Sequence, residues 1–260
     1  MSVNGSRQGT RHILKELGFT IRRVGDELHG AASITPLMHV PGTSHLRTSI
    51  LATWLDVLAG HLAVDAMAPR VPVTLELDVH LYRPAPGSGL IRGVGRTVKR
   101  GRSVFVAGVE FTAEHGEPLA AGAASFMSAP DSTARLPSEL SVDASAPEEP
   151  LRVPLAERAG CERGEPGTAV LPRSEDGLNA SNSVNGGLIA LAVEEAVLSL
   201  APGDTLSSLG VRYLQAVRIG PALATARLHA GLGLVELRDC GNDNRLAVTA
   251  TTRTFGGRLG

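Results

Sequence analysis

The first residues that could do chemistry are carboxylates that lie inside two otherwise apolar segments. Asp56 lies in ATWLDVLAG, and Glu194, followed directly by Glu195, lies in ALAVEEAV. An ionised carboxylate that is buried without a partner is costly, so each must be paired, reach a cleft or have a raised pKa. Such a carboxylate is a candidate general base or nucleophile. The alternative is a structural acid that pairs with an arginine of a neighbouring strand.

A second candidate lies just before the Glu194 segment, in NASNSVNGGLIALAVEE. Asn179, Asn182 and Asn185 recur every three residues and are followed by Gly186 and Gly187. Free N–H groups point outward at the start of a helix, and glycines let a ligand carbonyl approach them closely. We therefore predict donors for a developing oxyanion at this helix start, with Asn179 and Asn185 in the same site.

This spacing resembles the hotdog-fold acyl-CoA thioesterases, including the phenylacetate-pathway and 4-hydroxybenzoyl-CoA thioesterase-like branches. Those proteins carry N-x-x-G-x-x-H-G-G ahead of a central helix, with an Asp or Glu nine residues after the His. Here Glu194 follows Asn185 by nine residues. Asn stands in place of Gly at Asn182 and in place of His at Asn185.

The first half of the chain has the same spacing in PGTSHLRTSILATWLD. Arg47 precedes Asp56 by nine residues, and Thr48 and Ser49 stand where the glycines would be. His45 lies two residues before the position of the family histidine, and we interpret it as a turn residue, with a substrate-facing group as the alternative. The resemblance thus covers both halves, apart from the N-terminus and a linker.

In that family two hotdog units pair, and each active site lies between them. The resemblance implies two composite sites within this one chain. One would join Asp56 to the amides of Gly186 and Gly187, and the other would join Glu194 to the amides that begin the first helix. We favour the first because its glycines make the better oxyanion hole. The acid can act as a base on water or attack the thioester directly, and the sequence does not choose between them.

A basic cluster lies in RTVKRGRS, at an expected hairpin, and consists of Arg96, Lys99, Arg100 and Arg102. Arginine suits bidentate contact with phosphate, so these side chains are candidates for binding coenzyme A. The alternative is a solvated turn. The matching turn of the second half, CGNDNR, lacks the cluster, so coenzyme A contacts would be asymmetric.

The elements that must position these residues repeat along the chain. Each half has a short strand-like piece, a polar turn, an apolar helix at 49–67 or 187–201, and then four strand-like stretches. In the first of these, VPVTLELDVHLYRP, apolar and polar residues alternate without a break from Val73 to Tyr82, so Thr74 belongs to its wet face. This pattern predicts an internal duplication of an α+β unit, a tandem (double) hotdog whose sheets wrap the helices and pair edge to edge.

A polar segment rich in Ser, Pro, Asp and Glu separates the halves. It cannot bury enough apolar area to offset its chain entropy. We therefore predict an N-terminal hotdog domain at 1–128, a linker at 129–152 and a C-terminal hotdog domain at 153–260.

Composition argues against several classes of protein. The chain has 260 residues, with 25 Lys and Arg against 26 Asp and Glu, and this balance argues against nucleic-acid binding. It has no apolar run of about 18 residues and no apolar signal core, so we expect no membrane partner and a cytoplasmic protein. Cys161 and Cys240 lack zinc or disulfide spacing. P-loop, dinucleotide, serine-hydrolase and zinc-protease motifs are absent.

We therefore predict an acyl-CoA thioesterase that uses no metal or redox cofactor and meets coenzyme A only as part of its substrate. An alternative is a catalytically degenerate hotdog that binds acyl-CoA or assembles. A hotdog hydratase is disfavoured because the D-x-x-x-x-H helix start is not found. We also expect a homo-oligomer of double-hotdog chains, since an exposed sheet edge favours assembly.

Overall fold

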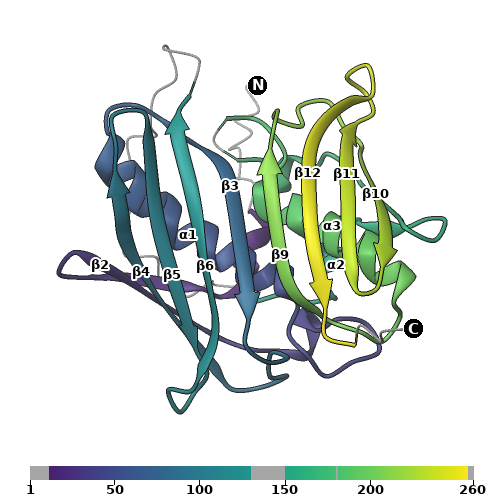
Figure 1. The fold of residues 1–260 in the computed structure, drawn as a ribbon, viewed down its shortest axis with the longest axis horizontal. Coiled ribbons are helices and arrows are strands. Elements are labelled where there is room, and N and C mark those ends of the chain that lie inside the picture. Colours follow the sequence, from purple (N-terminus) through teal and green to yellow (C-terminus); the bar gives the residue numbers. More distant parts are fainter. Residues whose placement is uncertain (1–11, 130–149, 180, 257–260) are drawn as a thin grey trace, which may run out of the picture.

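A computed structural model describes residues 12–129, 150–179 and 181–256. Its strands form one antiparallel sheet of twelve, in the order β1-β2-β4-β5-β6-β3-β9-β12-β11-β10-β8-β7. Two long helices lie behind this sheet in the view of Figure 1. The predicted α+β double hotdog is therefore confirmed.

The first repeat holds β1 (Thr20–Val24), β2 (Glu27–Ser33), α1 (Thr48–Met67), β3 (Pro72–Leu81), β4 (Leu90–Arg100), β5 (Val104–Thr112) and β6 (Pro118–Ser128). The second repeat holds α2 (Leu155–Ala159), β7 (Glu162–Arg163), β8 (Thr168–Leu171), α3 (Gly186–Leu200), β9 (Leu206–Tyr213), β10 (Ala222–His229), β11 (Leu232–Asp239) and β12 (Arg245–Thr254). Short 3-10 turns lie at Ile13–Leu17, Pro36–Met38 and Glu175–Gly177. The two long helices begin and end within one residue of their predicted bounds.

The helices are apolar on nearly every side because each is enclosed. α1 packs against β3, β4, β5 and β6 of its own repeat, and α3 packs against β8 and β10. α1 is long and apolar enough to cross a membrane by length and composition alone, yet most of it is buried inside the protein. This composition is what a helix enclosed by sheet on one side and helix on the other requires.

The two repeats join where β3 of the first repeat pairs with β9 of the second. β3 pairs with β9 from Glu76 opposite Arg212 to His80 opposite Ser208, which makes the two half-sheets continuous. On the inner side of this seam α1 packs directly against α3. The seam therefore brings each helix to the start of the other.

The alternation in β3 is interrupted, contrary to the sequence prediction. A β-bulge falls between Thr74 and Glu76, so Thr74 lies opposite Phe126, whereas Glu76 lies opposite Ser125. Phe126 is buried on the helix side of the sheet. Because directly paired residues share a face, the bulge turns Thr74 inward.

The N-terminal segment, which the resemblance left out, is part of the core. In the turn Ile13–Leu17, both terminal side chains are fully buried. Glu16 forms an ion pair with Arg158 at 2.8 Å, and its carbonyl accepts a hydrogen bond from the N–H of Leu151. The last part of the predicted linker therefore packs here; the linker's residues 130–149 lie outside the described residues, and the domain boundaries stay a prediction.

Candidate functional site

The loop before α3 holds the start of that helix in place. The Asn179 side chain accepts hydrogen bonds from the N–H groups of Ser181 and Ser183 and from the Ser183 hydroxyl. Asn182 has a positive φ of 56°, a conformation that asparagine tolerates better than most residues other than glycine. This tolerance explains why Asn182 can stand where the family that the chain resembles has Gly. Asn179, through its hydrogen bonds, helps to shape the loop.

Asn185 is the N-cap of α3. Its Oδ1 accepts the N–H of Gly187 at 2.8 Å, and its backbone carbonyl accepts the N–H groups of Leu188 and Ile189. Among the described residues, no hydrogen bond is made by the N–H of Gly186. Of the first four N–H groups of α3, this one therefore stays open to a ligand.

The space around the two glycines is tight. A Cβ on Gly187 would lie 2.4 Å from Oγ1 of Thr53 in α1 and 2.9 Å from Cδ1 of Leu14. A Cβ on Gly186 would lie 3.0 Å from the hydroxyl oxygen of Tyr213. Glycine is needed at 187 because α1 and the N-terminal segment approach its backbone this closely.

Asp56 lies on α1, and its charge acts on Tyr213, whose hydroxyl is bonded to the carbonyl of Gly186. Asp56 is partly exposed, and among the described residues its carboxylate accepts one hydrogen bond, from the Thr74 hydroxyl at 3.2 Å. Burial raises the pKa of Asp56 from 3.8 to about 6, and the Thr74 bond opposes that rise. Without the bulge in β3, Thr74 would point to the outer face of the sheet and could not make this contact.

Glu194 lies at the other composite position, and it is fully buried. Its Oε1 accepts the N–H groups of Thr48 at 2.8 Å and Ser49 at 3.3 Å. Its Oε2 accepts the Ser49 hydroxyl at 2.7 Å and the Arg47 guanidinium at 3.2 Å. The carboxylate therefore occupies the start of α1, in the place where a substrate oxygen would bind.

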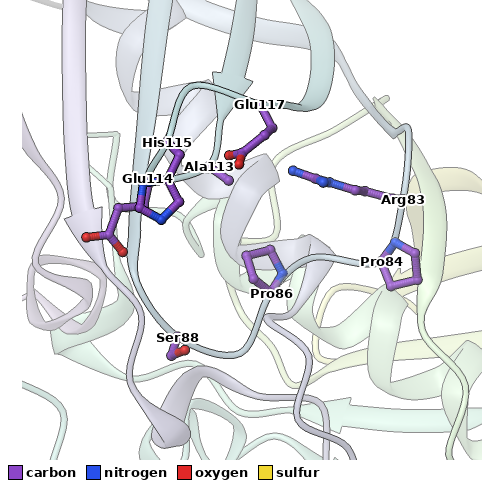
Figure 2. A pocket seen from close by; sticks show the side chains of 8 residues that line it. All are labelled: Arg83, Pro84, Pro86, Ser88, Ala113, Glu114, His115 and Glu117. Carbon is purple, nitrogen blue, oxygen red and sulfur yellow. The ribbon is translucent and has the colours of Figure 1, made fainter.

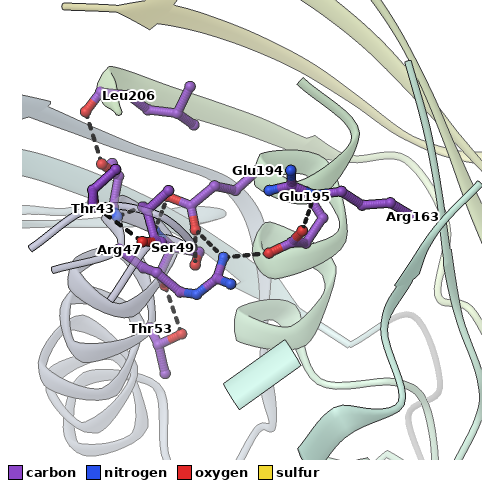
Figure 3. A network of polar contacts seen from close by, with 10 residues as sticks. Thr43, Arg47, Ser49, Thr53, Arg163, Glu194, Glu195 and Leu206 are labelled. Atoms are coloured by element: carbon purple, nitrogen blue, oxygen red, sulfur yellow. Dashed lines mark hydrogen bonds and ion pairs between the residues drawn. The ribbon is translucent and has the colours of Figure 1, made fainter. Parts of the chain in front are cut away.

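A chain of ion pairs extends from the buried Glu194 to Arg163 nearer the surface (Figure 3). The Nη1 of Arg47 lies 2.5 Å from Glu195, and the other oxygen of Glu195 lies 2.5 Å from Nε of Arg163 in β7. Two positive and two negative side chains thus balance one another. Among the described residues, Nε and Nη2 of Arg47 have no hydrogen-bond partner, so charge pairing rather than full hydrogen bonding holds this side chain.

Comparison of the two composite sites shows one chemical difference. Asp56 and Glu194 each lie nine residues after the N-cap of their own helix, so they are equivalent positions. Glu194 reaches the amides of the opposite helix start, whereas Asp56, one methylene shorter, bonds to Thr74 instead. The sequence placed both acids opposite helix starts; the geometry closes the Glu194 site and leaves the Asp56 site open. For Glu194 this favours the structural-acid alternative, with the arginine at the N-cap of α1 rather than on a strand.

The sequence of the first repeat matches a known protein family. Residues 45–120 match the family model of the thioesterase superfamily. The first repeat therefore resembles that superfamily in sequence, and the chain has the hotdog fold. The match supports thioester hydrolysis as a general activity, without choosing the substrate. No curated protein matches the chain.

Several solved structures are similar to this chain in fold. An acyl-ACP thioesterase from Bacteroides thetaiotaomicron has a TM-score of 0.64 at 13% identity, covering 88% of this chain and 98% of that one. The 12:0-ACP thioesterase from Umbellularia californica has a TM-score of 0.65 at 12% identity, covering 90% and 98%. The tesB protein of Mycobacterium avium subspecies paratuberculosis has a TM-score of 0.58 at 14% identity, covering 93% and 97%. At these identities the likeness concerns the fold alone.

The protein also has a surface pocket, whose lining side chains are drawn in Figure 2. It is formed by the loop after β3 and the β5–β6 hairpin, and it is lined by Arg83, Pro84, Pro86, Ser88, Ala113, Glu114, His115 and Glu117. The loop is fixed by a ring nitrogen of His45, 2.9 Å from the carbonyl of Ala85. His45 is thus a turn residue, and the pocket contains none of the predicted site residues.

The basic cluster divides in two. Arg96 is paired with Glu27 at 2.6 Å and with Glu110 at 2.9 Å. Lys99, Arg100 and Arg102 are exposed at the end of β4 and in the turn that follows. Of the four residues of this cluster, these three are therefore the ones whose charge is available to a phosphate.

Three residues that contact the candidate site were not predicted from the sequence: Tyr213, Thr74 and Thr53. Tyr213 ends a strand of the second repeat, and only the packing of β9 against α3 brings it to Gly186. Thr74 needed the bulge, which the regular alternation concealed. For Thr53, the signal was present in the sequence, because glycine at 187 indicates that a neighbouring side chain comes close.

The closed site makes a prediction about stability. In Glu194→Gln the carboxylate is lost while Arg47 stays buried, so we expect the free energy of unfolding to fall by about 3 kcal/mol. Chemical denaturation at neutral pH measures this. The control is Glu76→Gln, whose exposed pair with Arg212 at 3.3 Å should be worth less than about 1 kcal/mol. Equal losses in the two variants would contradict a stabilising role for the buried network.

The raised pKa of Asp56 makes a second prediction. The folded protein holds this proton more tightly than the unfolded chain does, so its stability should fall as pH rises from about 4 to about 6. Allowing for partial exposure, Asp56→Asn should gain about 1–2 kcal/mol of unfolding free energy at pH 7.5. The gain should disappear near pH 4. Denaturation across this range checks it, with the outward-facing Asp78→Asn as the control, and an Asp56→Asn protein less stable than wild type at pH 7.5 would rule it out.

Proposed function

We propose that this chain hydrolyses acyl-CoA thioesters at one composite site, with Asp56 as a general base. The observation that carries the proposal is a carboxylate with a pKa of about 6, close enough for its charge to act on Tyr213, whose hydroxyl is bonded to Gly186 at the start of α3. Such a group is ionised at neutral pH and is basic enough to accept a proton from water. The family match supports the general reaction class.

The reaction needs few groups. Asp56 removes a proton from water as the water oxygen bonds to the thioester carbon, and the carbonyl electron pair moves to the oxygen. The N–H of Gly186 stabilises the resulting oxyanion. When the intermediate collapses, the carbon–sulfur bond breaks and the thiolate takes the proton from Asp56. The products are the free acid and coenzyme A, and Asp56 is ionised again.

A base role is favoured over direct attack by the length of the side chain. Glu194 indicates how far a carboxylate must extend to contact the amides of the opposite helix. Asp56 is shorter by one methylene, which leaves room for a water molecule between its carboxylate and a thioester carbonyl bound at Gly186. A nucleophile would have to reach that carbonyl carbon itself.

Coenzyme A is favoured as the carrier by the position of the basic hairpin. Arg100 lies opposite Phe105, Phe105 opposite Phe126, and Phe126 opposite Thr74, the partner of Asp56. These residues form one row across four strands, so the hairpin lies at the same end of the sheet as Thr74, about 14 Å away. The nucleotide phosphates of coenzyme A can therefore lie near the hairpin while its thioester lies at Asp56.

We also propose a cytoplasmic protein that needs no metal or redox cofactor and assembles into a homo-oligomer. The second candidate function is an acyl-CoA-binding protein without catalysis. It is favoured by Asn185, which stands in place of the family histidine and uses its side chain to cap α3.

Substitution of Asp56 tests the proposal. Wild type should release thiol from at least one of a panel of short, medium, long and aromatic acyl-CoAs. Asp56→Asn should lose about 100-fold or more of kcat. Asp56→Glu should also lose at least about 10-fold, because its longer side chain would reach the start of α3 as Glu194 reaches that of α1. The rate should fall at low pH with a midpoint of about 6.

Glu194→Gln is the matched control for these variants, and its turnover per folded molecule should be close to that of wild type. Loss of turnover in Glu194→Gln with Asp56→Asn active would mean that the other composite site is the active one. Tight binding of acyl-CoA without thiol release from any substrate would favour the binding protein.

The basic hairpin gives a further prediction. Changing Lys99, Arg100 and Arg102 together to Gln should raise KM for acyl-CoA by about tenfold or more, with kcat unchanged. The same variant should hydrolyse an acyl-pantetheine, which lacks the nucleotide phosphates, as well as wild type does. A charge-matched control changes the exposed Arg227, Arg245 and Arg253 of the second repeat to Gln. An equal rise of KM in both triple variants would mean that overall charge, rather than the hairpin, binds the substrate.

A further inference from the structure

Tyr213 reaches the start of α3 from the end of β9. Its hydroxyl donates a hydrogen bond to the carbonyl of Gly186 at 3.1 Å. The hydroxyl oxygen also lies 3.0 Å from where a Cβ on Gly186 would be. The phenol therefore lies directly over the residue whose N–H is open.

The same phenol lies near Asp56. Burial, and then the negative charge of Asp56, raise the pKa of Tyr213 well above its usual value. Tyr213 therefore keeps its proton and remains a donor at any pH at which the protein works. Among the described contacts, Asp56 bonds to Thr74 rather than to Tyr213, so the tyrosine hydroxyl is not committed to the base.

The start of α3 has too few open donors for an oxyanion. The N–H of Gly187 is bonded to the Asn185 side chain, and the next two N–H groups are bonded to the Asn185 carbonyl. That leaves the N–H of Gly186. Sites that stabilise a tetrahedral oxyanion usually supply two or more donors, and side-chain hydroxyls, including tyrosine, serve in this role.

We propose that the hydroxyl of Tyr213 is the second donor to the thioester oxyanion, beside the N–H of Gly186. This inference rests on the proposed thioesterase activity and adds a catalytic residue from the other strand of the β3·β9 seam. Tyr213 keeps its proton through the reaction. It binds the oxygen as charge develops there and releases it when the carbon–sulfur bond breaks.

The change of partner requires little movement. As the first residue of α3, Gly186 has a carbonyl that also accepts the N–H four residues later in the helix. This carbonyl stays satisfied when the tyrosine O–H turns toward substrate. The hydroxyl can therefore change its partner without leaving the Gly186 carbonyl unbonded.

The test is Tyr213→Phe, compared with wild type on the acyl-CoA that wild type hydrolyses fastest. The variant should lose about 100-fold in kcat/KM, mostly in kcat, and keep the fall in rate at low pH with its midpoint of about 6. Two inhibitors separate catalysis from packing. A trifluoromethyl ketone analogue of the thioester, whose hydrate mimics the tetrahedral intermediate, should bind more weakly by a similar factor. A thioether analogue, which lacks the carbonyl oxygen, should bind within about twofold of wild type.

The matched control is Tyr82→Phe, since Tyr82 is the chain's other tyrosine and is 67% exposed. It should behave as wild type in every assay. An active wild type with a fully active Tyr213→Phe would overturn this inference and leave the proposed function standing. Equal weakening of the ketone and the thioether would also overturn it, because the phenol would then serve packing alone. A wild type that hydrolyses no thioester would remove the proposed function and this inference together.

Discussion

The contact between the Glu194 carboxylate and the start of α1 is the interaction on which the asymmetry of the molecule depends. Pairing of β3 with β9 brings each central helix to the start of the other, so the fold creates two sites where a carboxylate faces a helix N-terminus. Anions are stabilised there by the open N–H groups and the helix dipole. At one of the two sites the protein's own side chain has taken the place of a ligand.

The second site differs through side-chain length and neighbours, rather than through the backbone. Asp56 is one methylene shorter than Glu194, and it is held by a threonine hydroxyl rather than by amides and an arginine. The charge of Glu194 is therefore balanced by its partners, whereas Asp56 has a raised pKa. A duplicated fold can assign stability to one copy of a site and chemistry to the other, because different side chains occupy equivalent positions in the two repeats.

Much of this arrangement could be predicted from the sequence. Hydrophobic periodicity and the repeated order of elements located both helices within one residue and predicted the paired hotdog units. The nine-residue spacing predicted Asp56 and Glu194 opposite the helix starts, and the hydrogen bonds from Thr48 and Ser49 show this position for Glu194. The spacing could not distinguish the open site from the closed one, because the difference depends on where the side chains of Arg47 and Asn185 point. Thr74 was assigned to the wrong face because a bulge has no signature in an alternating pattern, and the position of Tyr213 depends on the packing of β9 against α3, which the sequence pattern does not specify.

The departure of Asn185 from the family histidine has a physical consequence for the active-site geometry. An asparagine cap uses its oxygen to bind the N–H of Gly187, so one of two glycine donors is no longer available to a substrate. A hydroxyl from β9 lies at the same helix start, on a side chain that burial keeps protonated. In the proposed mechanism, Tyr213 therefore supplies a donor in place of the amide that the asparagine cap occupies.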